Sequence, residues 1–161
     1  MRRLTSLFFG VFLLSLWVLP ARMATAQSIP YDKAGNDLLF ERIQKRKPLS
    51  PSDEKAKEAL LTLLPEGKTS GYLYESPNVL IAYLGPLNDL NVEILTADIS
   101  AAKQEAIDWF VKQGLSLNAL CDLPVSFYLN VDAARSIREK NFVFNPIAEH
   151  CLPDTKKKRS K

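Results

Sequence analysis

The stretch Val79-Leu80-Ile81-Ala82-Tyr83-Leu84 decides how this chain folds, because it is apolar at every position. Turn-forming residues flank it, with Ser76-Pro77-Asn78 before it and Gly85-Pro86 after it. Successive side chains of a strand point to opposite faces, so a continuous apolar run is typical of a strand that is covered on both sides. The sequence therefore predicts a central strand at residues 79–85 with packing partners on both faces.

Three further segments are predicted to be strands of the same sheet. Residues 70–75 precede the first turn, and residues 91–96 alternate apolar and polar side chains after the second. Short connections of this kind join antiparallel neighbours, so these strands are expected to form a meander. Residues 125–131 form the predicted fourth strand, whose position in the sheet the sequence leaves open.

Two amphipathic helices are predicted around this sheet. Ser50 can cap a helix that has Pro51 at its first position and Asp53 at its third, and the helix ends before Pro65. Asp98 or Ser100 can cap a second helix, which extends through Gln113 and which Gly114 can terminate. Its apolar stripe consists of Ile99, Ala102, Ala106, Trp109 and Phe110.

Shorter helices are expected at residues 36–45 and 132–140. The predicted fold class is α+β, with a small, mainly antiparallel sheet of about four strands packed against two main amphipathic helices.

The N-terminal residues have the pattern of a secretory signal peptide. Arg2 and Arg3 precede an apolar run at residues 4–19, and the small residues Ala24-Thr25-Ala26 follow it. The run is about 16 residues long, shorter than the roughly 20 that a membrane-spanning helix needs. We therefore expect export, with cleavage between Ala26 and Gln27, and a periplasmic, cell-surface or secreted location. An uncleaved membrane anchor is the alternative.

Four segments follow from these patterns. They are a signal peptide at residues 1–26, a leader and short helix at residues 27–48, a single α+β domain at residues 49–152 and a disordered basic tail at residues 153–161. The tail offers candidate contacts to a polyanion such as anionic lipid or a wall polymer, through Lys156, Lys157, Lys158, Arg159 and Lys161.

The segment between the predicted signal peptide and the predicted tail is acidic, although the whole chain has a net positive charge. The whole chain has 21 basic and 18 acidic side chains, but the basic excess lies in the signal peptide and the tail. Between these two ends, acidic residues outnumber basic ones. Because a nucleic-acid-binding domain presents a basic face, no specific nucleic-acid partner is expected.

The chain contains two cysteines, Cys121 and Cys151, in no C-x-x-C pair. In an exported protein this even number most simply predicts one disulfide, and two buried free thiols are the alternative. A closed loop of about 30 residues would stabilise the fold by about 3–4 kcal/mol in the chain-entropy model.

Residues for catalysis or cofactor binding are few. The single histidine, His150, lies between Glu149 and Cys151, whose side chains are expected to diverge, so no metal site is predicted. A cysteine hydrolase would need Cys121 free to pair with His150. The carboxylate pairs Asp89–Glu93 and Glu105–Asp108 suit an ordinary solvated surface. No glycine-rich nucleotide motif occurs, so no cofactor is expected.

Aromatic residues gather on the predicted strands. Tyr72 and Tyr74 are expected to share one strand face, and Tyr83, Phe127 and Tyr128 lie on neighbouring strands. Burial in the core is the favoured interpretation of this group. If they were exposed together, they would form a recognition surface.

These patterns favour a small noncatalytic interaction module that binds an unidentified macromolecule of the cell envelope or exterior. One alternative is a small carboxylate-dependent extracytoplasmic hydrolase. Another is a structural accessory that its basic tail tethers to anionic surfaces.

Overall fold

The computed structural model describes residues 29–123, 125–140 and 142–152. The predicted signal peptide with its cleavage site at Ala26 and Gln27, and the predicted basic tail at residues 153–161, lie outside this range. Within the described ranges, no helix is long and apolar enough to cross a membrane.

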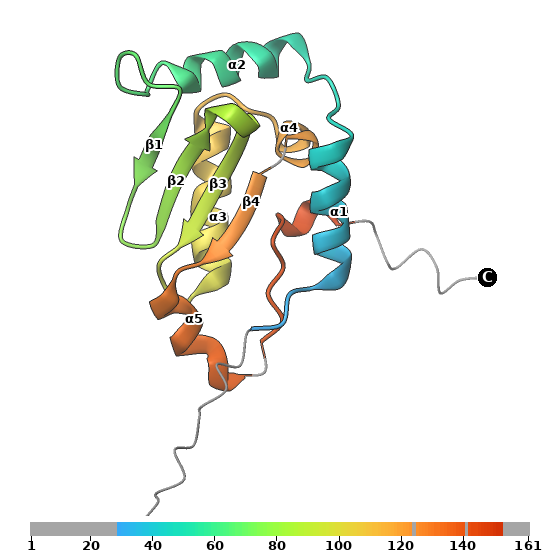
Figure 1. Cartoon of the computed structure of the whole chain (residues 1–161), viewed down its shortest axis with the longest axis vertical. Helices are drawn as coiled ribbons and strands as arrows, with labels where there is room; N and C mark the ends of the chain where they lie inside the picture. The colour runs from blue at the N-terminus through green and yellow to red at the C-terminus, as the bar shows by residue number, and fades with distance from the viewer. Residues whose placement is uncertain (1–28, 124, 141, 153–161) are drawn as a thin grey trace, which may run out of the picture.

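Four strands form one mixed sheet in the order β1-β2-β3-β4. β1 (Ser70–Glu75), β2 (Val79–Leu84) and β3 (Asp89–Ile94) are antiparallel neighbours, which confirms the predicted meander. β4 (Val125–Leu129) lies parallel to β3. The connection from β3 to β4 contains α3 and α4, which return the chain to the end of the sheet at which β3 begins. The structure is therefore α+β with a mostly antiparallel sheet (Figure 1).

In the described part of the chain, five α-helices accompany the sheet: α1 (Lys33–Gln44), α2 (Pro51–Leu61), α3 (Ile99–Lys112), α4 (Leu117–Asp122) and α5 (Val131–Ile137). Short 3-10 helices lie at η1 (Gly85–Leu87), η2 (Arg138–Lys140) and η3 (Glu149–Cys151). The two main predicted helices correspond to α2 and α3, with Ser50 and Asp98 as their caps. Gly114 has φ of 97°, as its predicted role after α3 requires.

Several boundaries differ from those that the sequence predicts, each for a local reason. Asp32 caps α1 by accepting hydrogen bonds from Ala34 and Gly35, so this helix begins at Lys33 and not at Asn36. Asn88 is left-handed with φ of 51° and ends the turn after β2, so β3 begins two residues earlier than expected. Asn130 caps α5 and thereby ends β4 at Leu129.

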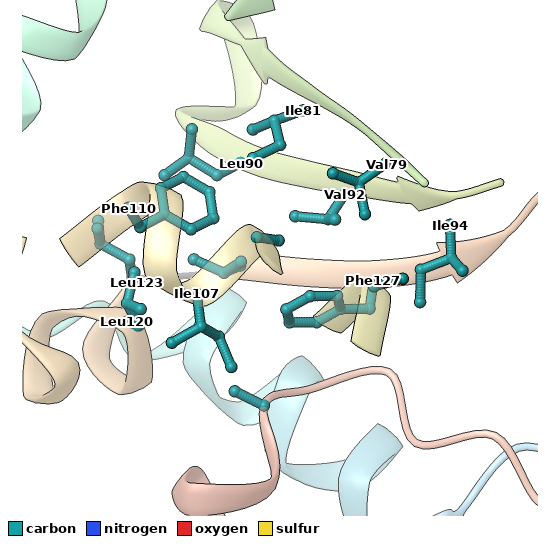
Figure 2. Packing of buried hydrophobic residues seen from close by; sticks show 14 of the residues in the cluster. Val79, Ile81, Leu90, Val92, Ile94, Ile107, Phe110, Leu120, Leu123 and Phe127 are labelled. Atoms are coloured by element: carbon teal, nitrogen blue, oxygen red, sulfur yellow. The ribbon is translucent and has the colours of Figure 1, made fainter. Parts of the chain in front are cut away.

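The core lies between one face of the sheet and α3. Alternate residues of the two central strands point into it and are almost completely buried, among them Ile81 and Val92 (Figure 2). Phe127 of β4 belongs to the same layer of buried side chains. Phe110 of α3 packs against this layer from the side of the helix. We call this side of the sheet the inner face.

Among the described elements, no helical layer covers the opposite side of the sheet. In Figure 1 α3 runs behind the sheet, whereas α1, α2 and α5 lie at its margins. Leu80, Ala82 and Leu84 of β2 point to this outer face and are half-buried. In the part of the chain that the structure describes, only one helical layer packs on the sheet, so the prediction that β2 is covered on both faces was wrong there.

The two ends of the described chain lie together beside β4. Tyr31 and Phe144 form a parallel bridge, in which the Phe144 amide donates to the carbonyl oxygen of Pro30 at 2.9 Å. The carbonyl oxygen of Pro146 accepts a 2.8 Å hydrogen bond from the Phe127 amide. The C-terminal segment, residues 142–152, thus lies along the outer edge of β4 and occupies part of its free backbone groups.

A buried carboxylate joins α2 to α4. Asp53 accepts hydrogen bonds from the Ser50 hydroxyl at 2.6 Å, from the Ser116 amide at 2.8 Å and from the Ser116 hydroxyl at 3.1 Å. These bonds, first that from Ser50 and then that from the Ser116 amide, lower the pKa of Asp53. Ser116 in turn caps α4, so one carboxylate fixes the start of both helices.

We predict that Asp53→Asn lowers the free energy of unfolding by about 1–2 kcal/mol at neutral pH, because an amide accepts these hydrogen bonds less well than a carboxylate does. The pKa of Asp53 is lower in the folded protein than in the unfolded chain, where a carboxyl has a pKa of about 3.9. The stabilisation by the Asp53 carboxylate is therefore complete above about pH 3.9, and it is lost as the pH falls through the pKa of the folded protein. Denaturant unfolding at neutral and acid pH measures the difference in the free energy of unfolding between the wild type and the variant. This difference should be smaller at acid pH.

Glu54→Gln is the matched control, because Glu54 is exposed in the same first turn and reports only the loss of a negative charge near the helix N-terminus. Equal losses of stability in the two variants would contradict the bridge to Ser116.

Candidate functional site

The most unusual buried group is Lys103, which lies in the middle of α3 and is 5% exposed. Its ammonium group donates to the carbonyl oxygens of Asn145 at 2.6 Å and Ile147 at 3.0 Å, and to Glu149 Oε1 at 3.0 Å. Three acceptors use all three ammonium protons, so the geometry requires the charged form. Burial lowers the pKa of Lys103, and Glu149 opposes this shift.

Two aromatic rings complete the surroundings of this ammonium. The Lys103 Nζ atom lies 5.3 Å from the ring centres of both Phe127 and Phe144. Such cation–π contacts favour a desolvated cation. We call Lys103 with the acceptors at residues 145, 147 and 149 the lysine anchor, because it fastens the C-terminal segment to α3.

A cleft of about 620 Å³ opens beside the lysine anchor. Its polar walls include Asp32, Ser100 and His150, and its apolar walls include Ile99 and Phe142. The charged groups at the cleft are already engaged, since Asp32 caps α1 and Lys103 has no free proton to donate. Among the described residues that line the cleft, no nucleophilic side chain is hydrogen-bonded to a base.

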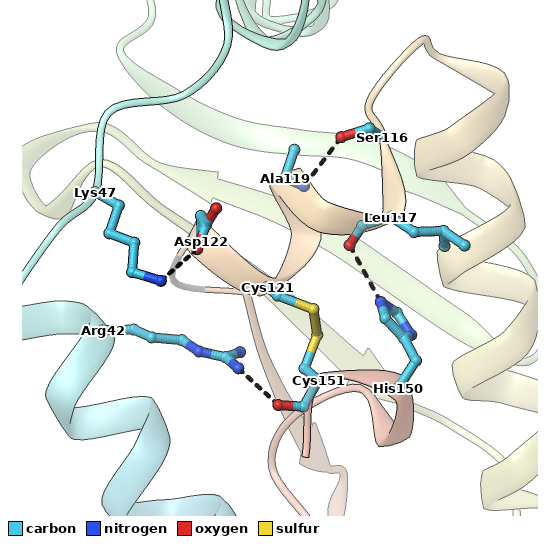
Figure 3. The surroundings of a disulfide bond; sticks show 9 residues. All are labelled: Arg42, Lys47, Ser116, Leu117, Ala119, Cys121, Asp122, His150 and Cys151. Carbon is cyan, nitrogen blue, oxygen red and sulfur yellow. Dashed lines mark hydrogen bonds and ion pairs between the residues drawn. A yellow bond between two sulfur atoms is a disulfide. The ribbon is translucent and has the colours of Figure 1, made fainter. Parts of the chain in front are cut away.

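The disulfide between Cys121 and Cys151, which the sequence predicts, joins α4 to η3 with a Cα–Cα distance of 5.3 Å. Arg42 of α1 donates to the carbonyl oxygen of Cys151 at 3.1 Å, and Lys47 pairs with Asp122 at 3.1 Å (Figure 3). Since both sulfurs are bonded to each other, Cys121 has no thiol for the cysteine hydrolase alternative.

His150 packs beside this disulfide, on the side away from Arg42 (Figure 3). Its Nε2 atom lies 3.2 Å from the carbonyl oxygen of Leu117, and because a carbonyl only accepts, the ring nitrogen donates. Its ligand atom and the sulfurs of Cys121 and Cys151 all lie within 4.8 Å of one another. The expectation that these neighbouring side chains diverge was therefore wrong for His150 and Cys151, because η3 turns both toward the same helix, α4. It holds for Glu149, whose carboxylate binds Lys103 and Asn145 instead.

One carboxylate of each pair that the sequence nominates has other partners. Asp89 pairs with Arg46 at 2.9 Å, and burial raises its pKa against the opposing effect of Arg46. Glu105 accepts from Asn78 at 2.8 Å and from Tyr74 at 3.3 Å. Hydrogen bonds from Ser76 and then Asn78 lower the Glu105 pKa.

The strand tyrosines divide between the two sheet faces. A β-bulge shifts the register of β1 between Tyr72 and Tyr74, so Tyr72 pairs with Ala82 and Tyr74 with Ile81. The expectation that these two tyrosines share a face was wrong for this reason. Tyr74 turns inward and stacks on Trp109 at 5.3 Å between ring centres.

Among the remaining tyrosines, Tyr83 is buried, whereas Tyr72 is 67% exposed and Tyr128 37% exposed. Burial raises the pKa of Tyr128, and the nearby Glu93 carboxylate and Tyr72 phenol raise it further. The strand register places Tyr72, Glu93 and Tyr128 on the same face of the sheet. The favoured prediction of burial thus holds for Tyr83 and Phe127 but not for Tyr72 and Tyr128.

We define the outer sheet face by the residues that register and burial place on the uncovered side. The set comprises Ser70, Tyr72, Glu75, Leu80, Ala82, Leu84, Asp89, Asn91, Glu93, Ser126 and Tyr128. Apolar side chains of β2 form its centre, and one tyrosine stands on each edge strand. No lysine or arginine occurs in the four strands, and in the described ranges neither Glu75 nor Glu93 forms an ion pair.

Sequence reasoning missed the role of Lys103 altogether. Its signal was present, since Lys103 follows Ala102 and precedes Ala106 within the apolar stripe of its helix. A lysine beside a buried stripe ordinarily extends its charged end into water, however, and only the position of residues 145–149 gives it buried acceptors.

Comparisons with known proteins yield no match to a family model, a curated protein or a solved structure. Function must therefore be argued from the surfaces and side chains of this chain itself.

We predict that Lys103→Met lowers the free energy of unfolding by about 2–4 kcal/mol, because two buried carbonyl oxygens lose their donor while the side-chain volume is kept. Hydrogen exchange should show early opening of residues 142–152, with the amides of Phe144 and Cys151 losing protection. Lys112→Met on the exposed end of α3 is the control and should leave both measurements unchanged. Unaltered exchange in the Lys103 variant would mean that the lysine anchor does not hold the segment.

Proposed function

We propose that this protein is an exported, noncatalytic binding module and that the outer sheet face is its binding surface. One observation carries the proposal: β2 is apolar at every position, yet the described helices cover only one of its faces. Sheets with one solvated face ordinarily alternate apolar and polar residues along each strand. A strand that keeps Leu80, Ala82 and Leu84 on the solvated face is suited to a partner that completes the missing layer.

The arrangement of the tyrosines supports the same proposal. Tyr72 and Tyr128 stand on the two edge strands with the apolar row of β2 between them. Tyrosine is enriched among residues that dominate binding energy, because its ring buries a large area and loses few rotamers. Exposed tyrosines around a smaller apolar centre therefore provide anchors for a partner.

Charge narrows the chemistry of that partner. Glu75 and Glu93 lie on the outer sheet face, and no lysine or arginine of the described residues forms an ion pair with them. A segment that combines apolar side chains with lysine or arginine would complement both properties of this surface. A nucleic acid would not, because its phosphates would meet carboxylates. We propose a basic, apolar polypeptide segment of another protein as the ligand.

Export is a proposal that rests on the N-terminal pattern, and the disulfide is compatible with an oxidising compartment. Tethering through Lys156, Lys157, Lys158, Arg159 and Lys161 remains a separate proposal about residues outside the described ranges. The carboxylate-dependent hydrolase is the weaker alternative, since Asp89 and Glu105 already have hydrogen-bonding partners.

A displayed library of random peptides, selected on the disulfide-intact protein, tests the proposed ligand chemistry. Selected peptides should combine apolar residues with lysine or arginine. Synthetic versions should bind Tyr72→Ser/Tyr128→Ser at least about tenfold more weakly than the wild type, which corresponds to about 1.4 kcal/mol. Calorimetry measures these affinities. Glu93→Lys should also weaken the binding of these peptides, and the loss of affinity should be larger at low salt than at high salt.

Val111→Ser removes an apolar side chain of similar exposure from the far end of α3 and is the matched control. It should bind the peptides as the wild type does. Selection of acidic peptides, failure to select any peptide, or equal binding to the double tyrosine variant would each contradict the proposal.

A further inference from the structure

The side chains of Cys121, His150 and Cys151 form a cluster whose chemistry the disulfide conceals. Two thiolate sulfurs and an imidazole nitrogen are ligands that zinc and other thiophilic ions prefer. The three ligand atoms already lie within 4.8 Å of one another. Around a tetrahedral zinc ion with bonds of about 2.1–2.3 Å, donor atoms are separated by roughly 3.5–3.8 Å. Small side-chain movements would therefore suffice once the sulfur–sulfur bond is open.

We propose that reduction of the Cys121–Cys151 disulfide creates a binding site for a thiophilic divalent ion such as Zn²⁺, with Cys121, Cys151 and His150 as its protein ligands. A dithiol or phosphine reductant supplies two electrons, and two protons complete the thiols. Both protons leave again when the thiolates bind the ion, so the complex of two thiolates and Zn²⁺ is neutral. Water occupies the fourth position, as in zinc sites with three protein ligands.

Two features of the structure favour retention of this geometry without the disulfide. The lysine anchor holds residues 145–149 against α3 through contacts that involve neither cysteine. Cys121 lies within α4, whose start Ser116 and Asp53 fix independently. The two elements that carry the ligands thus remain attached to the same core.

One nearby cation favours the thiolates as well. Arg42 donates to the carbonyl oxygen of Cys151, whereas Lys47 is paired with Asp122 (Figure 3). Cations near a thiol stabilise its ionised form. His150 is exposed, and turning a ring nitrogen toward the ion costs a single hydrogen bond to Leu117.

The test uses the full mature chain, reduced with a phosphine under anaerobic conditions and titrated with Cd²⁺ and Zn²⁺. The expected result is one ion per chain, an ultraviolet thiolate-to-Cd²⁺ charge-transfer band and a higher melting temperature with Zn²⁺, because ligands of the folded state stabilise it. His150→Ala should weaken binding by about tenfold or more while leaving both thiols in place. The disulfide-intact protein should bind no ion, and it should show neither the charge-transfer band nor the higher melting temperature.

Asn118→Ala is the matched control, because Asn118 is exposed on α4 but is not among the proposed ligands, and it should bind as the wild type does. Equal binding by His150→Ala, absence of the charge-transfer band or a lower melting temperature with Zn²⁺ would overturn the proposal, the last because it signals binding to the unfolded chain. If reduction alone unfolds the protein, far-ultraviolet circular dichroism must show that Zn²⁺ restores the fold; failure to restore it would also overturn the proposal.

Discussion

The contacts of the buried Lys103 ammonium are the interaction on which the position of the C-terminal segment, residues 142–152, depends. Dehydrating a lysine is costly, and three acceptors and two aromatic rings offset this cost. All three acceptors come from residues 145–149, so the charge can be satisfied only when this segment is in place. The segment then supplies Phe144 to pair with Tyr31 and Pro146 to bind the edge of β4. Both ends of the described chain therefore rely on one side chain of α3.

The described helices pack on only one face of the sheet, so its other face is exposed. α3 covers the inner face, α2 and α4 are joined at their starts by Asp53, and the C-terminal segment follows the edge of β4. No described element remains for the outer sheet face, where Tyr72 and Tyr128 accompany the apolar row of β2. The proposed binding role follows from this division between covered and uncovered faces, and the proposed metal site is independent of it.

Local signals in the sequence predicted most of the elements correctly. Caps such as Ser50 and Gly114 act through hydrogen bonds and backbone angles within a few residues, so they can be recognised without the fold. Parity and compartment likewise predicted the disulfide. What the sequence could not predict depends on distant segments: the acceptors of Lys103, the bulge that separates Tyr72 from Tyr74, the parallel placement of β4 and the missing second layer over β2.

The lysine anchor can be tested most directly by nitrogen-15 nuclear magnetic resonance of the Lys103 ammonium in the intact protein at neutral pH. The account predicts a positively charged group with slow proton exchange and hydrogen-bond couplings to the carbonyl carbons of Asn145 and Ile147. A surface lysine such as Lys112 should exchange too fast to be detected in the same spectrum. A Lys103 signal that exchanges equally fast, or that has the chemical shift of a neutral amine, would contradict the account.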